Sequence, residues 1–426
     1  MKSPRLSIAA RGFLLLASAL ALSSPAAFGQ SVSGFLLGKI QNFQQTSFAA
    51  PVANSTQPFQ FGGLINAGTA TINSASMTFT GSSSPRVFTA AGLDFSILDT
   101  FTTQAMLDAA YGSGNYNLSI NTSAGVLTRT IFLFPFSYPT TARLTVAAGD
   151  WQNNVLVLNS AQDYTFTWGA FANAQTADLI QFAIRGSSVN LAPFPATQTS
   201  YTLPAGTLQP GTDYVCDLAF IRVAGATAGD TNIGSGYATL VKDTGFTIHT
   251  PAPAFAVTAA VSEKTHGASG TFDIPLPAVE CRSGGANGDH TLVVAFTNNV
   301  LSGNATLSTG TGSIVGAPTI TGNMMTINLT GVTNAETVIL TLDNVTDSFS
   351  QVLPATMLTA RFLFGDTNGN GTVNATDVSQ TKAIVGQTLD ATNFRGDFNL
   401  SGAINATDVG AAKAAVGTAL PGALSK

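Results

Sequence analysis

The chain has 426 residues, of which 45% are hydrophobic and 9% charged, and its formal net charge is -5. This balance excludes a charge-driven disordered chain, which would be poor in apolar residues, and a nucleic-acid-binding protein, which needs a basic surplus. The 42 Gly and 18 Pro lie among Thr- and Val-rich runs. The sequence therefore predicts a mainly β protein with many short strands, divided by its length into roughly three domains.

Residues 1–29 are predicted to be a secretory signal peptide. Three basic residues open the segment, an apolar run of 11 residues follows at 12–22, and residues 27 and 29 are small, which suits cleavage before Gln30. Because a membrane-spanning helix needs about 20 apolar residues, this run is too short to be an anchor, and no later stretch is long enough. The pattern predicts a secreted protein, either extracellular or attached to the cell surface.

Residues 30–135 are predicted to form a β-rich N-terminal domain that contains one short helix. The alternation of Tyr116, Leu118 and Ile120 places their side chains on one face of a strand. Residues 102–111 are rich in helix formers and are followed by a glycine, which suits the left-handed position after a helix end.

Residues 136–249 are predicted to form a β-sandwich. Tyr164, Phe166 and Trp168 alternate onto one face of a strand, and a Pro-Gly turn precedes Tyr214 at the start of another strand. A tyrosine in that place is typical of a tyrosine corner, in which the hydroxyl bonds back to the preceding turn. On these residues the segment resembles a fibronectin type III domain, which implies a seven-stranded sandwich and no particular activity.

A Thr-Pro-Ala-Pro segment at 250–253 is predicted to be a stiff, extended linker. Beyond it, residues 255–364 contain three alternating runs bounded by Gly or Asn turns, at 292–296, 326–329 and 338–342. Runs of this kind predict a second sandwich, immunoglobulin-like in its pattern.

The two cysteines, Cys216 and Cys281, fall in different predicted domains. Disulfides form readily in exported proteins, so a bridge between the domains is one interpretation. No histidine or basic cluster near either position would activate a thiolate, which favours the alternative of two buried, unreactive thiols.

Residues 365–422 contain an internal duplication. The first copy begins at Asp366, and the second begins 31 residues later at Asp397. Each copy carries oxygen-bearing side chains at loop positions 1, 3 and 5, glycine at 6 and a carboxylate at 12, which is the pattern of a calcium loop. The predicted ligands are Asp366, Asn368, Asn370, the Thr372 carbonyl and Asp377 in the first loop, and Asp397, Asn399, Ser401, the Ala403 carbonyl and Asp408 in the second.

These loops predict two Ca2+ sites, of which the second is the weaker. A hard cation takes roughly six to eight oxygen ligands, and glycine at position 6 permits the sharp turn of the loop. Two carboxylates per loop predict the modest affinity of an extracellular site, and Ser401 is a weaker ligand than Asp or Asn. Asn374 and Asn405 stand at position 9, where they can also cap helices that run to Gly386 and Gly417.

This duplicated pattern, with Asp rather than Glu at position 12, resembles a type I dockerin module. The resemblance implies a small all-α, EF-hand-like domain that folds on calcium and docks into a cohesin module of a partner protein. It also implies a recognition surface at positions 10, 11 and 17 of each repeat, identical in the two repeats and therefore pseudo-two-fold. These positions are Ala375, Thr376 and Lys382 in the first repeat and Ala406, Thr407 and Lys413 in the second.

The upstream sequence offers no recognised catalytic motif. It contains no Gly-x-Ser-x-Gly elbow, His-Glu-x-x-His zinc motif or phosphate loop, and its three histidines are not in metal-ligand spacing. A glycosidase needs two carboxylates that face the sugar across a cleft. Glu263 and Glu280 are the pair that the third predicted domain offers, although the sequence favours surface positions for both.

Together these patterns predict tandem immunoglobulin- or fibronectin-like β-sandwiches followed by a small helical calcium-binding domain. The favoured function is non-catalytic, with the C-terminal module mediating docking to a cohesin-like partner. In one alternative, residues 30–135 act in polysaccharide breakdown, through glycosidase or carbohydrate-binding activity. In another, the C-terminal module docks in cis on the neighbouring sandwich as a calcium-stabilised cap.

Overall fold

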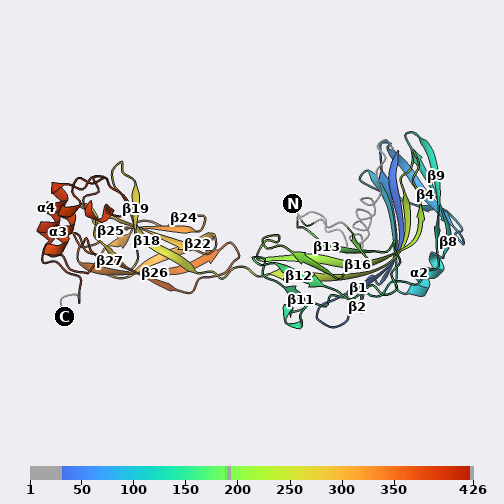
Figure 1. The fold of residues 1–426 in the computed structure, drawn as a ribbon, viewed down its shortest axis with the longest axis horizontal. Coiled ribbons are helices and arrows are strands. Elements are labelled where there is room, and N and C mark those ends of the chain that lie inside the picture. Colours follow the sequence, from blue (N-terminus) through green and yellow to red (C-terminus); the bar gives the residue numbers. More distant parts are fainter. Residues whose placement is uncertain (1–30, 188, 190–192, 423–426) are drawn as a thin grey trace. The chain divides into compact units, whose positions relative to one another are not determined.

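The computed structural model describes residues 31–187, 189 and 193–422 of a mainly β chain. The predicted signal peptide, residues 1–29, lies outside the described residues. The chain divides into two compact units, Met1–Ala252 and Pro253–Lys426, and the division falls within the predicted linker (Figure 1). Among the described residues, no helix combines the length and the apolar character needed to cross a membrane.

An 11-stranded sheet runs through the first unit. Its main path is β14 (Phe194–Pro195), β13 (Leu179–Ile184), β16 (Thr212–Thr227), β17 (Gly236–Thr250), β1 (Val32–Gln44), β3 (Phe59–Ala67), β7 (Asp94–Phe101) and β6 (Thr89–Ala91). Three short strands pair beside this path, namely β2 (Val52–Ala53), β10 (Trp151–Gln152) and β11 (Val155–Val157).

Strand β1 connects the two predicted N-terminal domains within this sheet. Its residues 35–44 pair in parallel with residues 236–245 of β17, and its other edge pairs with β3. The predicted boundary at residue 135 therefore does not separate two independent sheets, because strands from both sides of it are hydrogen-bonded neighbours. Alternation in the sequence identifies a strand but does not identify the partner with which it pairs.

Two hydrophobic cores occupy opposite ends of the long strands β16 and β17. The first core lies against a four-stranded sheet of β5 (Arg86–Val87), β4 (Ile72–Phe79), β8 (Gly114–Thr122) and β9 (Gly125–Leu133). Tyr116, Leu118 and Ile120 are buried in it, as their alternation predicts. The predicted short helix is α2 (Gln104–Ala110), which begins after the side-chain cap of Thr103.

The second core lies against the two-stranded sheet of β12 (Tyr164–Thr167) and β15 (Ser200–Leu203). Phe166 and Trp168 are both buried there. The predicted tyrosine corner is present, because the hydroxyl of Tyr214 accepts a hydrogen bond from the backbone N–H of Gln209 at 2.8 Å. This bond closes the turn that leads into β16.

The second unit contains a β-sandwich. One sheet consists of β19 (Thr271–Pro275), β18 (Val257–Thr265), β21 (His290–Phe296), β25 (Met324–Thr330), β23 (Ser313–Ile314) and β24 (Thr319–Thr321). The other consists of β20 (Val279–Glu280), β27 (Thr356–Phe362), β26 (Glu336–Asp347) and β22 (Val300–Thr309). The three predicted alternating runs fall on β21, β25 and β26, and their apolar faces meet in one core.

The helices α3 (Ala375–Ala383) and α4 (Ala406–Ala415) pack on one end of this sandwich (Figure 1). The described residues also contain two 3-10 turns, η1 (Ala148–Asp150) and η2 (Phe394–Gly396). Two small apolar clusters join the helices to the sandwich. One contains Val279, Leu363, Val373, Ala415 and Leu420, and the other contains Ile274, Cys281, Phe398 and Ala412.

Both cysteines are buried as free thiols, Cys216 in the first unit and Cys281 in the second. Burial raises the pKa of both thiols, that of Cys281 to about 12. The structure therefore agrees with the prediction of two unreactive thiols and not with that of a disulfide bridge.

Candidate calcium and docking module

The two C-terminal helices begin with the same capping arrangement. The side chain of Asn374 accepts from the backbone N–H of Thr376, while the carboxylate of Asp377 accepts from the backbone N–H of Asn374. The equivalent residues Asn405 and Asp408 form the same capping box at α4. A capping box satisfies backbone donors that the first helical turn leaves free, so position 12 fixes each helix as well as facing its loop.

In the first loop, the two carboxylates organise the backbone around them. Asp366 accepts hydrogen bonds from the N–H groups of Gly369, Asn370 and Gly371, at 2.9, 3.1 and 2.8 Å. Gly371 has a φ of 86°, a left-handed conformation that favours glycine. Asp366 and Asp377 are both fully buried, and their oxygens bracket the loop at its first and last positions.

The second loop repeats this arrangement with two differences. Asp397 accepts from the N–H groups of Ser401 and Gly402 at 3.0 and 2.8 Å, and it is fully buried like Asp408. However, Leu400 stands where the first loop has a glycine, and its φ of 61° is one that non-glycine residues rarely adopt. The Ser401 hydroxyl also donates to the Ala403 carbonyl at 3.1 Å, so one predicted ligand is bonded to another.

The donor chemistry of both loops fits a hard cation. Burial raises the pKa of Asp366 and of Asp408, because each carboxyl is removed from water. Within the described ranges, no group of three His, Cys, Asp or Glu side chains forms a metal cluster, so the remaining donors must be amide, hydroxyl and carbonyl oxygens. Such oxygens suit Ca2+ rather than a softer transition metal.

The structure places all ten predicted ligands in these two loops. Asn368 and Asn370 in the first loop, like Asn399, Ser401 and Ala403 in the second, are exposed, whereas the four aspartates at positions 1 and 12 are buried. Thr372 is half-buried. Each loop therefore has buried acidic residues at its ends and uncharged oxygen donors at the surface.

Two equivalent backbone hydrogen bonds join the two halves of the module, one donated by each half. The N–H of Gly386, after α3, donates to the carbonyl of Ile404, and the N–H of Gly417, after α4, donates to the carbonyl of Val373, both at 2.9 Å. Val373 and Ile404 occupy position 8 of their loops and are buried. The internal duplication of the sequence thus becomes a pseudo-two-fold pairing of loops and helix ends.

The six predicted recognition residues are all exposed. They are Ala375, Thr376 and Lys382 on or beside α3 and Ala406, Thr407 and Lys413 on α4. The contacts between the module and the sandwich involve other residues, so this surface stays accessible.

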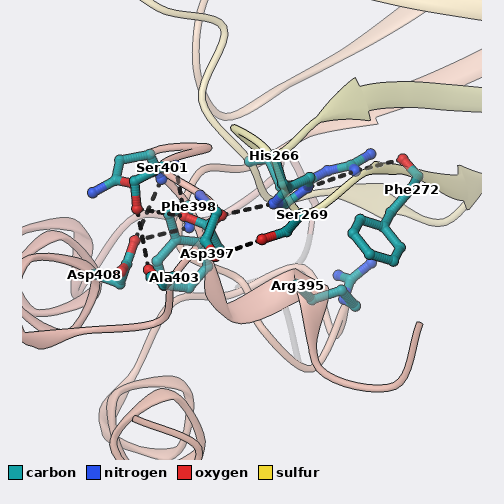
Figure 2. A network of polar contacts seen from close by, with 12 residues as sticks. His266, Ser269, Phe272, Arg395, Asp397, Phe398, Ser401, Ala403 and Asp408 are labelled. Atoms are coloured by element: carbon teal, nitrogen blue, oxygen red, sulfur yellow. Dashed lines mark hydrogen bonds and ion pairs between the residues drawn. The ribbon is translucent and has the colours of Figure 1, made fainter. Parts of the chain in front are cut away.

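The second loop packs on the tip of the β18–β19 hairpin (Figure 2). The Nδ1 atom of His266 lies 2.9 Å from the Oδ2 atom of Asp397, and both side chains are fully buried. Ser269 donates its hydroxyl to the carbonyl of Gly402 at 2.8 Å. A Cβ atom on Gly267 would lie 2.6 Å from the Ser401 carbonyl oxygen, so glycine permits this close approach.

A buried polar chain continues from His266 into the sandwich. Arg282 lies 3.2 Å from the Nε2 atom of His266 and also donates to Glu280 and to the Ser262 carbonyl. Because a guanidinium can only donate, Nε2 must accept, and Nδ1 then carries the proton that is donated to Asp397. The histidine is therefore neutral, in agreement with the effect of its burial, which lowers its pKa.

Glu280 is buried, which corrects the expectation of a surface position. Burial alone would raise the pKa of its carboxyl, but the hydrogen bonds and charge of Arg282 outweigh this effect and lower the pKa. Both carboxylate oxygens are occupied, by Arg282 and by the hydroxyl of Ser262. Glu280 cannot face a sugar in this arrangement, so the structure does not support a glycosidase pair with Glu263.

The first loop is closed by a different part of the chain. Thr372 forms a β-bridge with Ala419, and the N–H of Leu420 donates to the carbonyl of Gly371 at 2.9 Å. Leu420 is buried together with Val373 in one of the clusters between helices and sandwich. The C-terminal segment therefore covers the loop that the hairpin does not touch.

Sequence reasoning identified the loops and helices but missed the hairpin contact. His266, Ser269 and Phe272 are not part of any motif, and Phe272 stacks on Phe394 with ring centroids 5.2 Å apart. The available signal was weak, a histidine followed by a glycine at 266–267. Neither residue points to a partner 131 positions away.

Comparison with known proteins identifies the C-terminal region. Residues 364–416 match the model of the dockerin type I domain. Dockerin type I domains bind calcium, and the match implies docking to a cohesin module. No curated protein matches the chain significantly.

Several solved structures of tandem domains are similar to the chain at low identity. The I9–I11 tandem of titin is 8% identical, with 77% of this chain and 97% of that chain covered and a TM-score of 0.16. The FN1–FN3 domains of chicken CNTN1 are 10% identical, with 78% and 99% covered and a TM-score of 0.16. The D1–D4 fragment of ICAM-5 is 8% identical, with 77% of each chain covered and a TM-score of 0.23. At such TM-scores the fold rests on the strand pairing described above.

Proposed function

We propose that this chain is an exported, non-catalytic protein whose C-terminal module binds two calcium ions and docks to a cohesin-like module of a partner. The observation that carries the proposal is the joint presence of two buried acidic loop frameworks and two identical, exposed recognition sets on the helices that they support. The match of residues 364–416 to the dockerin type I domain supports the same function.

The calcium ions would be held by the predicted ligands of each loop. Asp366 and Asp377 would supply the negative charge in the first loop, and Asp397 and Asp408 in the second. A bound calcium ion supplies the positive charge that offsets the burial of these carboxylates, which otherwise raises the pKa of Asp366 and Asp408. Ordered loops in turn hold the capping boxes, and hence the helices that display the docking surface.

The second site is proposed to be the weaker one. Ser401 replaces an amide ligand, and Leu400 holds a left-handed backbone conformation that costs about 1 kcal/mol for a residue with a side chain. With two carboxylates in each loop, both sites are expected to fall in the range of extracellular modules, on the order of 0.1 to 1 mM.

Docking in cis and docking in trans are compatible in this arrangement. The sandwich contacts the second loop through His266 and Ser269, whereas Lys382 and Lys413 stay exposed on the two helices. We therefore propose that the sandwich is a permanent support for the module and that the helices bind the partner. The first unit would be the part that the docked protein presents.

The experiment that tests this function is a calcium titration of the full chain by isothermal titration calorimetry, followed by binding to an immobilised type I cohesin. We expect two calcium ions per chain, one after Asp366→Ala, and cohesin binding that is abolished by a chelator. Asp213→Ala, which alters an exposed aspartate on β16 of the first unit, is the matched control. Absence of calcium binding at about 10 mM, or cohesin binding that ignores the chelator, would contradict the proposal.

A further inference from the structure

The first unit contains a polar site on β1 and β17, at a place where the alternation of both strands leads one to expect further apolar residues. On β1, Phe35 and Leu37 enter the first core, and the next residues on that face are Lys39 and Gln41, which are only 4% and 6% exposed. On β17, Leu240 belongs to the same core, and the next residue on its face is Lys242. The register pairs Lys39 with Leu240 and Gln41 with Lys242, so the three polar side chains lie together.

Helix α2 adds further polar groups to this place. Gln104 and Asp108 are four residues apart and therefore share one face of the helix. The Lys39 ammonium donates to Asp108 at 2.7 Å, and the Gln41 amide donates to Gln104 at 3.0 Å. Gln104 in turn donates to Asp108 at 3.2 Å. These contacts form a continuous hydrogen-bonded wall rather than a set of separate surface side chains.

This wall faces a cavity of about 490 Å3, which Phe134 and Phe136 also line. The two phenylalanines are 46% and 48% exposed, and their rings stack with centroids 5.6 Å apart. Their segment is fixed to the sheet, because the N–H of Phe134 donates to the carbonyl of Ala224 at 2.8 Å. A cavity of this size, with polar groups on one side and aromatic faces at its edge, has the composition of a small-molecule site.

Two groups in the cavity wall have hydrogen-bonding or charge capacity to spare. The hydroxyl of Tyr138 is buried and has no hydrogen-bond partner among the described residues. The ammonium of Lys242 donates to Thr141 at 3.3 Å and lies 5.6 Å from the centre of the Phe43 ring, but the described ion pairs include no carboxylate for it, whereas Lys39 is paired with Asp108. Burial lowers the pKa of Lys242, as expected for an ammonium without a neighbouring anion. The cavity thus has an uncompensated positive charge.

We propose that this cavity binds an acidic saccharide, a sugar ring that carries a carboxylate. The exposed rings of Phe134 and Phe136 offer negative π faces to the C–H groups of a sugar ring. The amides, Asp108 and the free hydroxyl of Tyr138 supply donors and acceptors for sugar hydroxyls. The ammonium of Lys242 is positioned to bind the carboxylate through a charge-assisted hydrogen bond.

The test is binding of trigalacturonate to the full chain by isothermal titration calorimetry, beside the neutral trisaccharide cellotriose. We expect trigalacturonate to bind at least tenfold more tightly than cellotriose, with an affinity that falls as sodium chloride is raised. Lys242→Gln should lower the affinity for trigalacturonate at least tenfold and abolish the salt dependence. Phe134→Ala should lower the affinity and keep the salt dependence.

Phe132→Ala is the matched control, because Phe132 is an exposed neighbour of Phe134 that does not line the cavity. Its affinity for trigalacturonate should equal that of the unchanged protein. The melting temperature of each variant verifies that the first unit is folded, and Tyr138→Phe provides a second variant that removes a single hydroxyl. Equal affinity for the two trisaccharides, or no binding of trigalacturonate at about 10 mM, would overturn the proposal.

Discussion

The two loops of the C-terminal module share one pattern of ligand and capping positions but have different surroundings. The chain's own C-terminal segment closes the first loop through Thr372 and Leu420. A hairpin of the sandwich closes the second through His266 and Ser269. The helices that follow the loops are equivalent, with the same caps and the same exposed recognition residues.

This difference shows that the duplication determines the outer face of the module and not its inner face. Ligands, caps and recognition residues are local to each repeat, so both copies have them. The inner contacts depend on what the rest of the chain brings to each loop. We therefore expect the docking surface to be symmetric, whereas the buried polar contact that couples calcium binding to the sandwich is made by the second loop.

The largest expected effect is that of Asp397→Ala compared with Asp366→Ala. Both remove one calcium ligand and the acceptor of backbone N–H groups in its loop, but only Asp397→Ala also leaves the buried Nδ1–H of His266 without its acceptor. Loss of a charged acceptor for a buried donor costs about 3 kcal/mol, so Asp397→Ala should destabilise the second unit by this much more than Asp366→Ala.

Thiol labelling can measure this difference because each unit contains one buried cysteine. The labelling rate of Cys281 follows the population of the opened second unit, so about 3 kcal/mol corresponds to an increase on the order of a hundredfold. Cys216 is the internal control, and its rate should not change. Tryptophan fluorescence cannot replace this assay, since Trp151 and Trp168 both belong to the first unit. Equal Cys281 rates in the two variants would refute the coupling.

A second buried histidine of the same sandwich, His290, should make the stability of the second unit depend on pH. Burial lowers the pKa of His290 from 6.5 to about 4. Between these pH values the unfolded chain binds a proton that the folded chain does not, so stability is full above about 6.5 and is lost as the pH falls toward 4. The loss at pH 5 should be roughly 2 kcal/mol.

Calorimetric unfolding of His290→Gln at pH 7.5 and pH 5, with calcium at saturation, measures this contribution. The variant should lose less stability than the unchanged protein over that interval. His249→Gln, which alters an exposed histidine of the first unit, should follow the unchanged protein. If His290→Gln has the same pH dependence as the unchanged protein, the buried neutral state of His290 is wrong.

A smaller effect is expected for Gly267→Ala, which tests the approach of the hairpin to the second loop. The added Cβ would lie 2.6 Å from a carbonyl oxygen of Ser401, so hairpin and loop must separate. Gly316→Ala is the matched control, because Gly316 also has a positive φ but its Cβ would meet nothing within 4 Å. We expect Gly267→Ala to be less stable than Gly316→Ala by about 1 kcal/mol, measured by calorimetry. Equal stability would show that the loop does not rest on the hairpin.

The local features of the module are those that the sequence predicts best. The capping residue Asn374 lies three positions from Asp377, and the loop glycines lie within a single turn, so one stretch of chain contains the whole pattern. The tyrosine corner at Tyr214 is local in the same way. Such features need no knowledge of which strands or helices are neighbours.

The contacts that sequence reasoning missed join distant residues. The pairing of His266 with Asp397 spans 131 positions, and neither residue indicates the other. The cavity of the first unit is a further case. Only the parallel register of β1 and β17 reveals that Lys39 and Lys242 interrupt the same apolar face. The pairing of β1 with β17 across residue 135 was missed for the same reason, because a strand does not reveal its partner.

The smallest effect on stability is expected for the two recognition lysines, whose substitution should leave unfolding unchanged within about 0.5 kcal/mol. Their effect on docking tests the symmetry of the outer face. If both faces bind cohesin, Lys382→Ala or Lys413→Ala alone removes one of two equivalent orientations and lowers the affinity about twofold, which equals about 0.4 kcal/mol. The double variant should lose most of its binding, as measured on immobilised type I cohesin.

A different result would change the comparison between the loops. If Lys413→Ala abolishes docking while Lys382→Ala has no effect, only one orientation is used and the outer face is not symmetric in function. The sandwich that supports the second loop would then also select the orientation of the partner, although the recognition residues of both helices are exposed. Lengthening the chain between Phe362 and Gly365 would test this role of the sandwich, because it should restore the second orientation only if the sandwich blocks it.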